Sequence, residues 1–145
     1  MANIRIILMI SISLLSGALA AQECVPTPHR TTGTHYKPVT QQDGDVGKGF
    51  KFRGRILLSP DCTPVANARV AHWQAGKDGR YRDALRAYLQ SDEQGYFQFE
   101  TEWPNLLPPH IHFIVSKEGY DTLETQWIGG KQTTDAYFEM VIEEK

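Results

Sequence analysis

The sequence has few of the features that mark several large classes of protein. It has no run of like charges, and its 15 basic and 17 acidic side chains give a net charge of -2, so the basic surface expected of a nucleic-acid binder is missing. The 8 prolines and 12 glycines follow no repeat period, which argues against collagen-like, coiled-coil and solenoid architectures. No segment has the pattern of a long amphipathic helix. A chain of 145 residues with these features is expected to form one compact domain.

Long apolar runs are also scarce, and the one present lies at the N-terminus. A short basic lead (1–5) precedes an apolar run (6–15), and Ala18-Leu19-Ala20 supplies the small residues that signal peptidase requires. The run is about half of the ~20 residues that span a bilayer, which disfavours a transmembrane anchor. We therefore predict a signal peptide over residues 1–20 and an exported protein, periplasmic or secreted, with no membrane attachment after cleavage.

Cysteine is rare as well, since only Cys24 and Cys62 are present. In an oxidising compartment an even count favours a disulfide over free thiols. The bond would close a loop of about 38 residues and tie the N-terminal segment to the domain. A two-cysteine metal site is the poorer alternative, because thiolates are soft ligands and the other candidate ligands here are imidazoles and phenols.

Two regions follow the leader. Residues 21–47 are polar, rich in Thr, Pro, Gly and His, and have no strand or helix period, so we expect an extended arm. From residue 48 to 145, β-branched and aromatic segments alternate with turn residues at intervals of about ten to fifteen, which is typical of an all-β antiparallel sandwich. We expect strands at 50–58, 68–75, 96–101, 110–116 and 136–142, and either a strand or a helical turn at 85–89.

The pair His110 and His112 is the first candidate for chemistry. Side chains at i and i+2 of a strand point to the same face, so the two imidazoles would project together while Ile111 points away. This arrangement suits a metal ion, and it also suits a pair of surface or hydrogen-bonded histidines. His72 is a poor ligand candidate, because it alternates with Trp73 and faces the other way.

Several short motifs around these histidines occur in the order found in one enzyme family. They are PVANARV (64–70), WQA (73–75), GRYR (79–82), SDEQGYFQF (91–99), PPHIHF (108–113) and TQ (125–126). The series, with its eight-residue step from Trp73 to Tyr81, resembles the intradiol ring-cleavage dioxygenases, in the order expected of the protocatechuate dioxygenase branch. The resemblance runs from about Phe52 to Gly129, and residues 27–33 look like a reduced form of the arm in that branch.

The resemblance implies a β-sandwich core that holds non-heme Fe(III) with two tyrosinates and two histidines. It implies Tyr81, His110 and His112 as iron ligands and catalytic residues, and Trp73 and Gln126 as substrate-pocket residues. The implied reaction is cleavage of a catechol-type aromatic, bound as its dianion, by O2 to a muconate-type diacid. The family forms oligomers in which the arm often reaches a neighbour's pocket, so a homo-oligomer is also an expectation.

The loop before the two histidines departs from that pattern. Residues 104–109 contain neither the second tyrosine nor the arginine of the family, and Leu107 stands where the arginine would be. Water, hydroxide or another phenol remains as the fourth ligand, the phenols being those of Tyr36, Tyr88, Tyr96, Tyr120 and Tyr137. His29 and His35 reach a metal only if the arm folds back, onto its own domain or a neighbouring subunit. Arg80 and Arg82 are interpreted as solvated charges.

Two alternative functions therefore stay open. The first is a non-catalytic exported module that binds a metal, a catechol or a carbohydrate after losing the second tyrosine and the arginine. The second is an extracytoplasmic adhesion or interaction domain without a metal.

Overall fold

The computed structural model describes residues 22–145, so the predicted leader lies outside the described residues. This part of the chain forms strands and no helix, and accordingly contains no helix of the length and apolar character needed to cross a membrane. The strands are β1 (Phe50–Leu58), β2 (Thr63–Pro64), β3 (Arg69–Ala75), β4 (Tyr81–Gln90), β5 (Tyr96–Thr101), β6 (His110–Ser116), β7 (Leu123–Ile128) and β8 (Asp135–Ile142).

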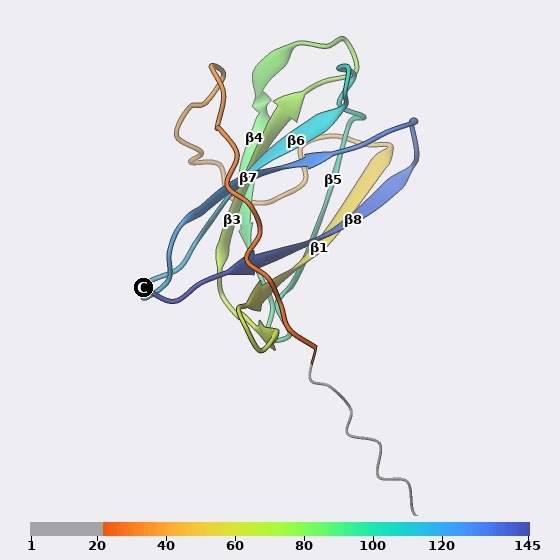
Figure 1. Cartoon of the computed structure of the whole chain (residues 1–145). Coiled ribbons are helices and arrows are strands. Elements are labelled where there is room, and N and C mark those ends of the chain that lie inside the picture. The colour runs from red at the N-terminus through yellow and green to blue at the C-terminus, as the bar shows by residue number, and fades with distance from the viewer. Residues whose placement is uncertain (1–21) are drawn as a thin grey trace, which may run out of the picture.

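The strands form two sheets that face each other, as Figure 1 shows. In the first sheet, β1 pairs with β5 and β2 on one side and with β8 on the other. The second sheet has the order β4-β3-β6-β7. All pairings are antiparallel except that of β8, which runs parallel to β1. The predicted all-β sandwich is therefore confirmed, with one parallel pair that the sequence pattern did not reveal.

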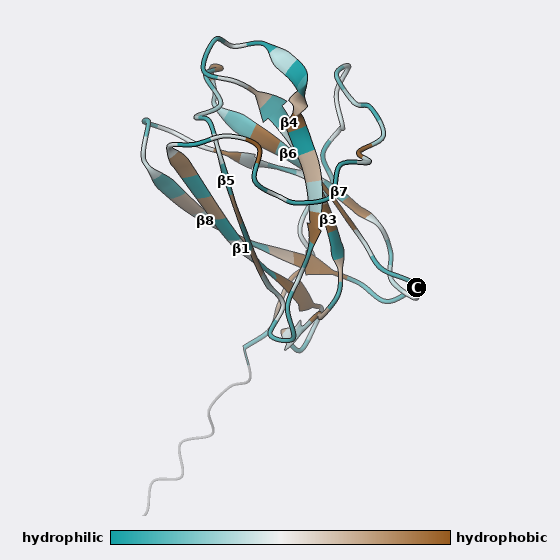
Figure 2. Ribbon diagram, turned by 180° about the vertical axis from the view of Figure 1, so that it is seen from behind, coloured by the Kyte–Doolittle hydropathy of each residue, from teal (hydrophilic) through white to brown (hydrophobic). Residues whose placement is uncertain are grey.

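The core lies between the two sheets and is rich in aromatic rings. Along β1 and β8, hydrophobic and hydrophilic positions alternate, which Figure 2 shows as brown and teal bands. Phe52 packs against Phe97, Phe99 and Phe113, with ring centroids 5.2 to 6.5 Å apart. Alternate side chains of a strand point to opposite faces, so one face of each sheet packs in this core. The other face of each sheet is free to contact other parts of the chain.

The arm runs across the outer face of the second sheet, in the orange trace of Figure 1. Backbone hydrogen bonds fix its course, from Thr27 N to Val141 O on β8, then from Arg30 N to Glu124 O on β7. It leaves at the opposite edge, where Tyr88 N on β4 donates to Gln41 O. The disulfide between Cys24 and Cys62 anchors its start.

Most strands lie where the sequence pattern predicts them. The expected strands at 50–58, 96–101 and 110–116 have the observed bounds, and those at 68–75 and 136–142 differ from them by one residue. Residues 85–89 belong to the longer β4. The pattern missed β7, because this edge strand pairs with β6 alone and mixes polar with apolar residues on both faces.

Candidate metal centre

Three side chains converge on the outer face of the second sheet. The Tyr81 hydroxyl oxygen lies 3.0 Å from Nε2 of His110 and 3.1 Å from Nε2 of His112. Tyr81 begins β4, and both histidines lie on β6 with the buried Ile111 between them pointing into the core. The strand period thus presents both imidazoles to the phenol, and we call these three residues the triad.

Hydrogen bonding fixes the proton of one imidazole. Nδ1 of His110 lies 2.9 Å from the carbonyl oxygen of Pro108, and a carbonyl only accepts, so Nδ1 carries the proton. The Nε2 lone pair of His110 therefore faces the Tyr81 oxygen. The single hydroxyl proton of Tyr81 can be donated to only one of its two nitrogen neighbours, while the Tyr81 oxygen can accept a hydrogen bond from Nε2 of His112.

Burial keeps the His112 imidazole neutral. Burial is the main cause that lowers the pKa of His112 from 6.5 to about 4, and electrostatic repulsion from His110 and His35 lowers it further. Nδ1 of His112 has no hydrogen-bond partner among the residues that the structure describes. Burial also raises the pKa of the Tyr81 phenol, against which the Arg86 guanidinium acts. At neutral pH the His112 imidazole and the Tyr81 phenol are thus both neutral.

The triad fits a hard or borderline metal ion. Around a metal with bonds of about 2.1 Å, two donors at a right angle lie about 3 Å apart, close to the separations seen here. Two imidazole nitrogens and a phenol oxygen that ionises on binding suit ferric iron. Within residues 22–145 no cluster of three His, Cys, Asp or Glu side chains has ligand geometry, so this donor set depends on a tyrosine.

Trp73 and Gln126 flank His112 in one row across the sheet. The register pairs Trp73 with His112 and His112 with Gln126, and the indole lies parallel to the imidazole at 5.0 Å between centroids. Gln126 Nε2 donates to the carbonyl oxygen of Thr31 on the arm at 2.8 Å. Trp73 therefore supports the His112 ring and Gln126 holds the arm, while their predicted contact with substrate stays a prediction.

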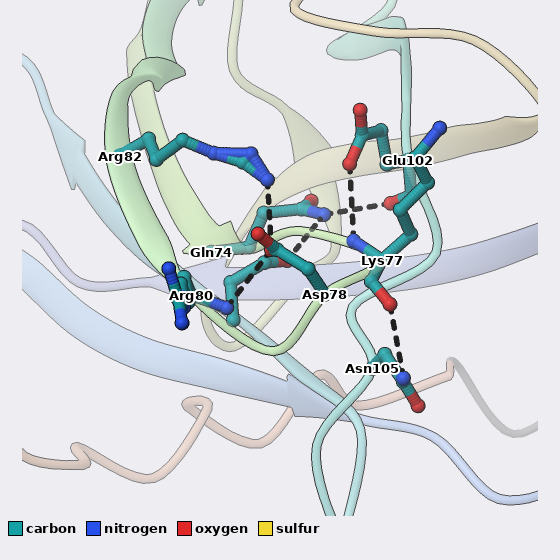
Figure 3. Close-up of polar contacts among 8 residues, drawn as sticks. Gln74, Lys77, Asp78, Arg80, Arg82, Glu102 and Asn105 are labelled. Atoms are coloured by element: carbon teal, nitrogen blue, oxygen red, sulfur yellow. Dashed lines mark hydrogen bonds and ion pairs between the residues drawn. The ribbon is translucent and has the colours of Figure 1, made fainter.

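The turn before Tyr81 is tied down by polar contacts (Figure 3). Asp78 Oδ1 accepts from the backbone N–H of Arg80 at 3.1 Å and from the Arg82 guanidinium at 2.7 Å. The backbone N–H of Lys77 donates to the Glu102 carboxylate at 3.0 Å. Arg80 and Arg82 thus lie in the scaffold of this turn, exposed to solvent, and the turn fixes where β4 starts and where Tyr81 points.

The arm adds two rings to the triad that lies beneath it. The imidazole of His35 stacks on the Tyr81 ring, with centroids 4.2 Å apart and planes within 8°. The next ring, Tyr36, meets Trp73 edge to face at 5.5 Å. The arm folds back onto its own domain, which is one of the two arrangements that the sequence left open.

Arg86 is a site residue that sequence reasoning missed. Its side chain is buried, pairs with Trp73 in the register, and donates from Nη1 to the carbonyl oxygen of His35 at 3.3 Å. The sequence pattern did not indicate this role. Residues 85–89 fitted either a strand or a helical turn, and the direction of the Arg86 side chain depends on which of the two forms.

Two of the five alternative phenols have hydroxyls bonded elsewhere, since Tyr88 donates to Gln42 and Tyr137 donates to Glu139. Cationic side chains lie over the rings of Tyr96 and Tyr120. Leu107, at the family's arginine position, is 99% exposed and points away from the protein.

Known proteins with similar sequences include 1,2-dioxygenases of hydroxyquinols. The chain is 31% identical to a hydroxyquinol 1,2-dioxygenase of Rhizobium sp. (strain MTP-10005), in an alignment covering 54% of this chain and 37% of that enzyme. It is 33% identical to a 6-chlorohydroxyquinol 1,2-dioxygenase of Cupriavidus pinatubonensis, with 57% and 40% covered. The chain thus spans about two fifths of the length of these curated relatives. No protein-family model matches the sequence.

Solved structures of such enzymes share the fold. The dioxygenase domain of a dioxygenase and carbohydrate-binding protein fusion from Streptomyces sp. SirexAA-E matches with a TM-score of 0.74 and 20% identity, over 83% of this chain and all of that one. An intradiol ring-cleavage dioxygenase from Tetranychus urticae matches with a TM-score of 0.65 and 22% identity, over 71% and 64%.

Proposed function

This chain belongs to the intradiol ring-cleavage dioxygenase family, and from that premise we propose that it binds non-heme ferric iron and cleaves a catechol-type aromatic with O2. The observation that carries the proposal is the convergence of the Tyr81 oxygen with Nε2 of His110 and His112 at 3.0 and 3.1 Å. Both atoms of O2 enter the product, a muconate-type diacid. We also propose that the chain is exported.

Tyr81, His110 and His112 are the residues that would hold the iron. Bound ferric iron supplies a Lewis acid and template that favours the catechol dianion, whose electron-rich ring reacts with O2. On binding iron, Tyr81 would release its phenol proton to solvent and would become an anionic ligand. The Pro108 carbonyl holds the proton on Nδ1 of His110, so that Nε2 stays a donor to the metal.

The surroundings of the triad keep it ordered and partly dry. The Trp73 indole, which is fully buried, stacks beside the His112 ring from the neighbouring strand β3 and fixes its plane. The arm covers part of the triad from above, and Gln126 secures it through the Thr31 carbonyl. Exclusion of water strengthens every electrostatic interaction in such a site.

The test combines iron content, visible absorption and O2 uptake of the purified, iron-loaded protein with a panel of catechols. We expect a broad tyrosinate-to-iron charge-transfer band that shifts when catechol is added without oxygen. Tyr81→Phe should abolish the band and lower O2 uptake by more than roughly a hundredfold, because it removes a ligand. Tyr88→Phe is the matched control and should change neither, since the Tyr88 hydroxyl bonds to Gln42. An iron-loaded protein that consumes no O2 with any catechol would contradict catalysis.

A second candidate function is binding of a catechol without turnover. The observation that favours it is the loop 104–109, which brings no polar side chain to the triad from the arginine position, since Leu107 there is 99% exposed. An arginine can stabilise charge that develops in a transition state, and its loss leaves ground-state binding intact. A catechol-induced shift of the absorption band without O2 uptake would favour this function over catalysis.

A further inference from the structure

The segment of the arm that passes over the triad is held in place on both sides. At its start, the Thr31 carbonyl accepts from Gln126 at 2.8 Å. Two residues later, Gly33 lies against His112, where an added Cβ would meet the ring carbon Cε1 at 3.4 Å. Gly33 also has a φ of +74°, a backbone conformation that residues with a side chain rarely adopt. A glycine therefore suits both this backbone conformation and the close approach to His112.

This placement brings one more donor-bearing ring to the triad. His35 lies with its ring face on Tyr81, at 4.2 Å between centroids, and its carbonyl accepts from the buried Arg86 at 3.3 Å. Its backbone is thus fixed while its side chain stays exposed. The neighbouring ring of Tyr36 turns instead to Trp73. His35 is therefore the arm side chain that combines contact with the triad and a nitrogen donor.

We propose that His35 is a fourth protein ligand of the metal centre, supplied by the arm, so that the site consists of three imidazoles and one phenolate. This inference rests on the proposed function, because it requires iron at the triad. In the described residues the three imidazoles do not lie in ligand geometry, so the exposed His35 side chain must rotate on its held backbone to bring a nitrogen to the metal. Imidazole is a common ligand for iron, and a fourth donor still leaves room for a substrate with two oxygens.

The decisive comparison is between variants that keep a ring at position 35 and differ in its donor. His35→Phe keeps the stacking on Tyr81 and removes both nitrogens. We expect its iron affinity, measured by chelator competition, to fall at least about tenfold. X-ray absorption fine structure at the iron K-edge, which detects coordinated imidazoles, should show one imidazole fewer than in the wild type. His35→Tyr supplies an oxygen donor and should retain iron with a shifted charge-transfer band.

His29→Phe is the matched control. His29 is the other histidine of the arm, it is exposed, and it lies between Pro28 and Arg30, which bond to β7. This variant should keep the wild-type affinity and the wild-type imidazole signal. Thermal unfolding of each apoprotein verifies that the variants fold.

The outcomes separate this inference from the function on which it rests. If the wild type is coloured and His35→Phe matches it in affinity and imidazole signal, His35 is not a ligand and the proposed function stands. If the wild type binds no iron, and Tyr81→Phe is therefore indistinguishable from it, both proposals fall.

Discussion

Two buried histidines of this protein, His72 and His112, lie on opposite faces of the same sheet and therefore have different surroundings. Both are buried, and burial is the main cause that lowers the pKa of each to about 4. His72 faces the core, stacks on Phe99 at 3.7 Å and lies 2.8 Å from the Gly44 carbonyl through Nε2. His112 faces the triad. The difference comes from strand alternation on β3 and β6, because paired positions share a face.

His72 should make the fold sensitive to acid. Its pKa is about 4 in the folded protein and 6.5 when exposed, so the unfolded chain binds the extra proton between these values. The free energy of unfolding should be highest above pH 6.5 and should fall by roughly 3 kcal/mol toward pH 4 through this residue alone. In His72→Phe, which keeps the stack on Phe99, denaturant unfolding at pH 7 and pH 4 should show a smaller loss. An equal loss in both proteins would contradict this assignment.

At the scale of elements, the turn between β3 and β4 positions Tyr81, the proposed phenol ligand. Tyr81 is the first residue of β4, directly after a turn that Asp78 organises through Arg80 and Arg82. A ligand at a strand end depends on the turn for its position, whereas His112 is fixed in the middle of a sheet by β3 and β7. Of the three proposed ligands, Tyr81 is thus the one whose position is easiest to disturb.

Asp78→Ala should weaken iron binding with little effect on folding. The substitution removes the acceptor for the Arg80 amide and the Arg82 guanidinium, so the start of β4 gains freedom. We expect a severalfold loss of iron affinity and a small change in Tm. Asp92→Ala is a matched control, because Asp92 caps the turn at the other end of β4 with contacts to Gln94 and Tyr96. Equal iron affinities for the two variants would argue against this role of the turn.

At the scale of the whole molecule, the arm joins parts of the structure that are distant in sequence. It starts at the disulfide to Cys62, contacts β8 and β7, crosses the triad, reaches β4 and ends at β5, where Val46 N donates to Glu100 O. The disulfide accords with the proposed export, since such bonds persist in oxidising compartments. The arm is therefore a part of the site, although it forms no strand.

Removal of the disulfide should loosen the arm as well as the fold. For a sequence separation of 38, the chain-entropy relation gives a loss of roughly 3 to 4 kcal/mol in the free energy of unfolding for Cys24→Ser with Cys62→Ser. Iron affinity should fall too, because His35 then lies on an arm with one fewer anchor. Denaturant unfolding and chelator competition measure the two effects. An arm held by its hydrogen bonds alone would instead leave iron affinity unchanged.

The sequence by itself determined most of the strands and which of their residues share a face. Alternation predicted β1, β5 and β6 and the joint projection of His110 and His112, because the side-chain period of a strand is local. Local pattern also separated His72 from Trp73. The motif series pointed to the family because it preserves residue types in order, even where the loop 104–109 departs from the pattern.

Only the tertiary structure decided how distant segments meet. The parallel pairing of β8 with β1, the edge strand β7 and the burial of Arg86 depend on contacts between segments far apart in the chain. The same holds for the arm, whose polar sequence has no period to indicate a course. Its path over the triad follows from single hydrogen bonds, a glycine at a close approach and a stacked ring, and such contacts leave no repeating pattern in the sequence.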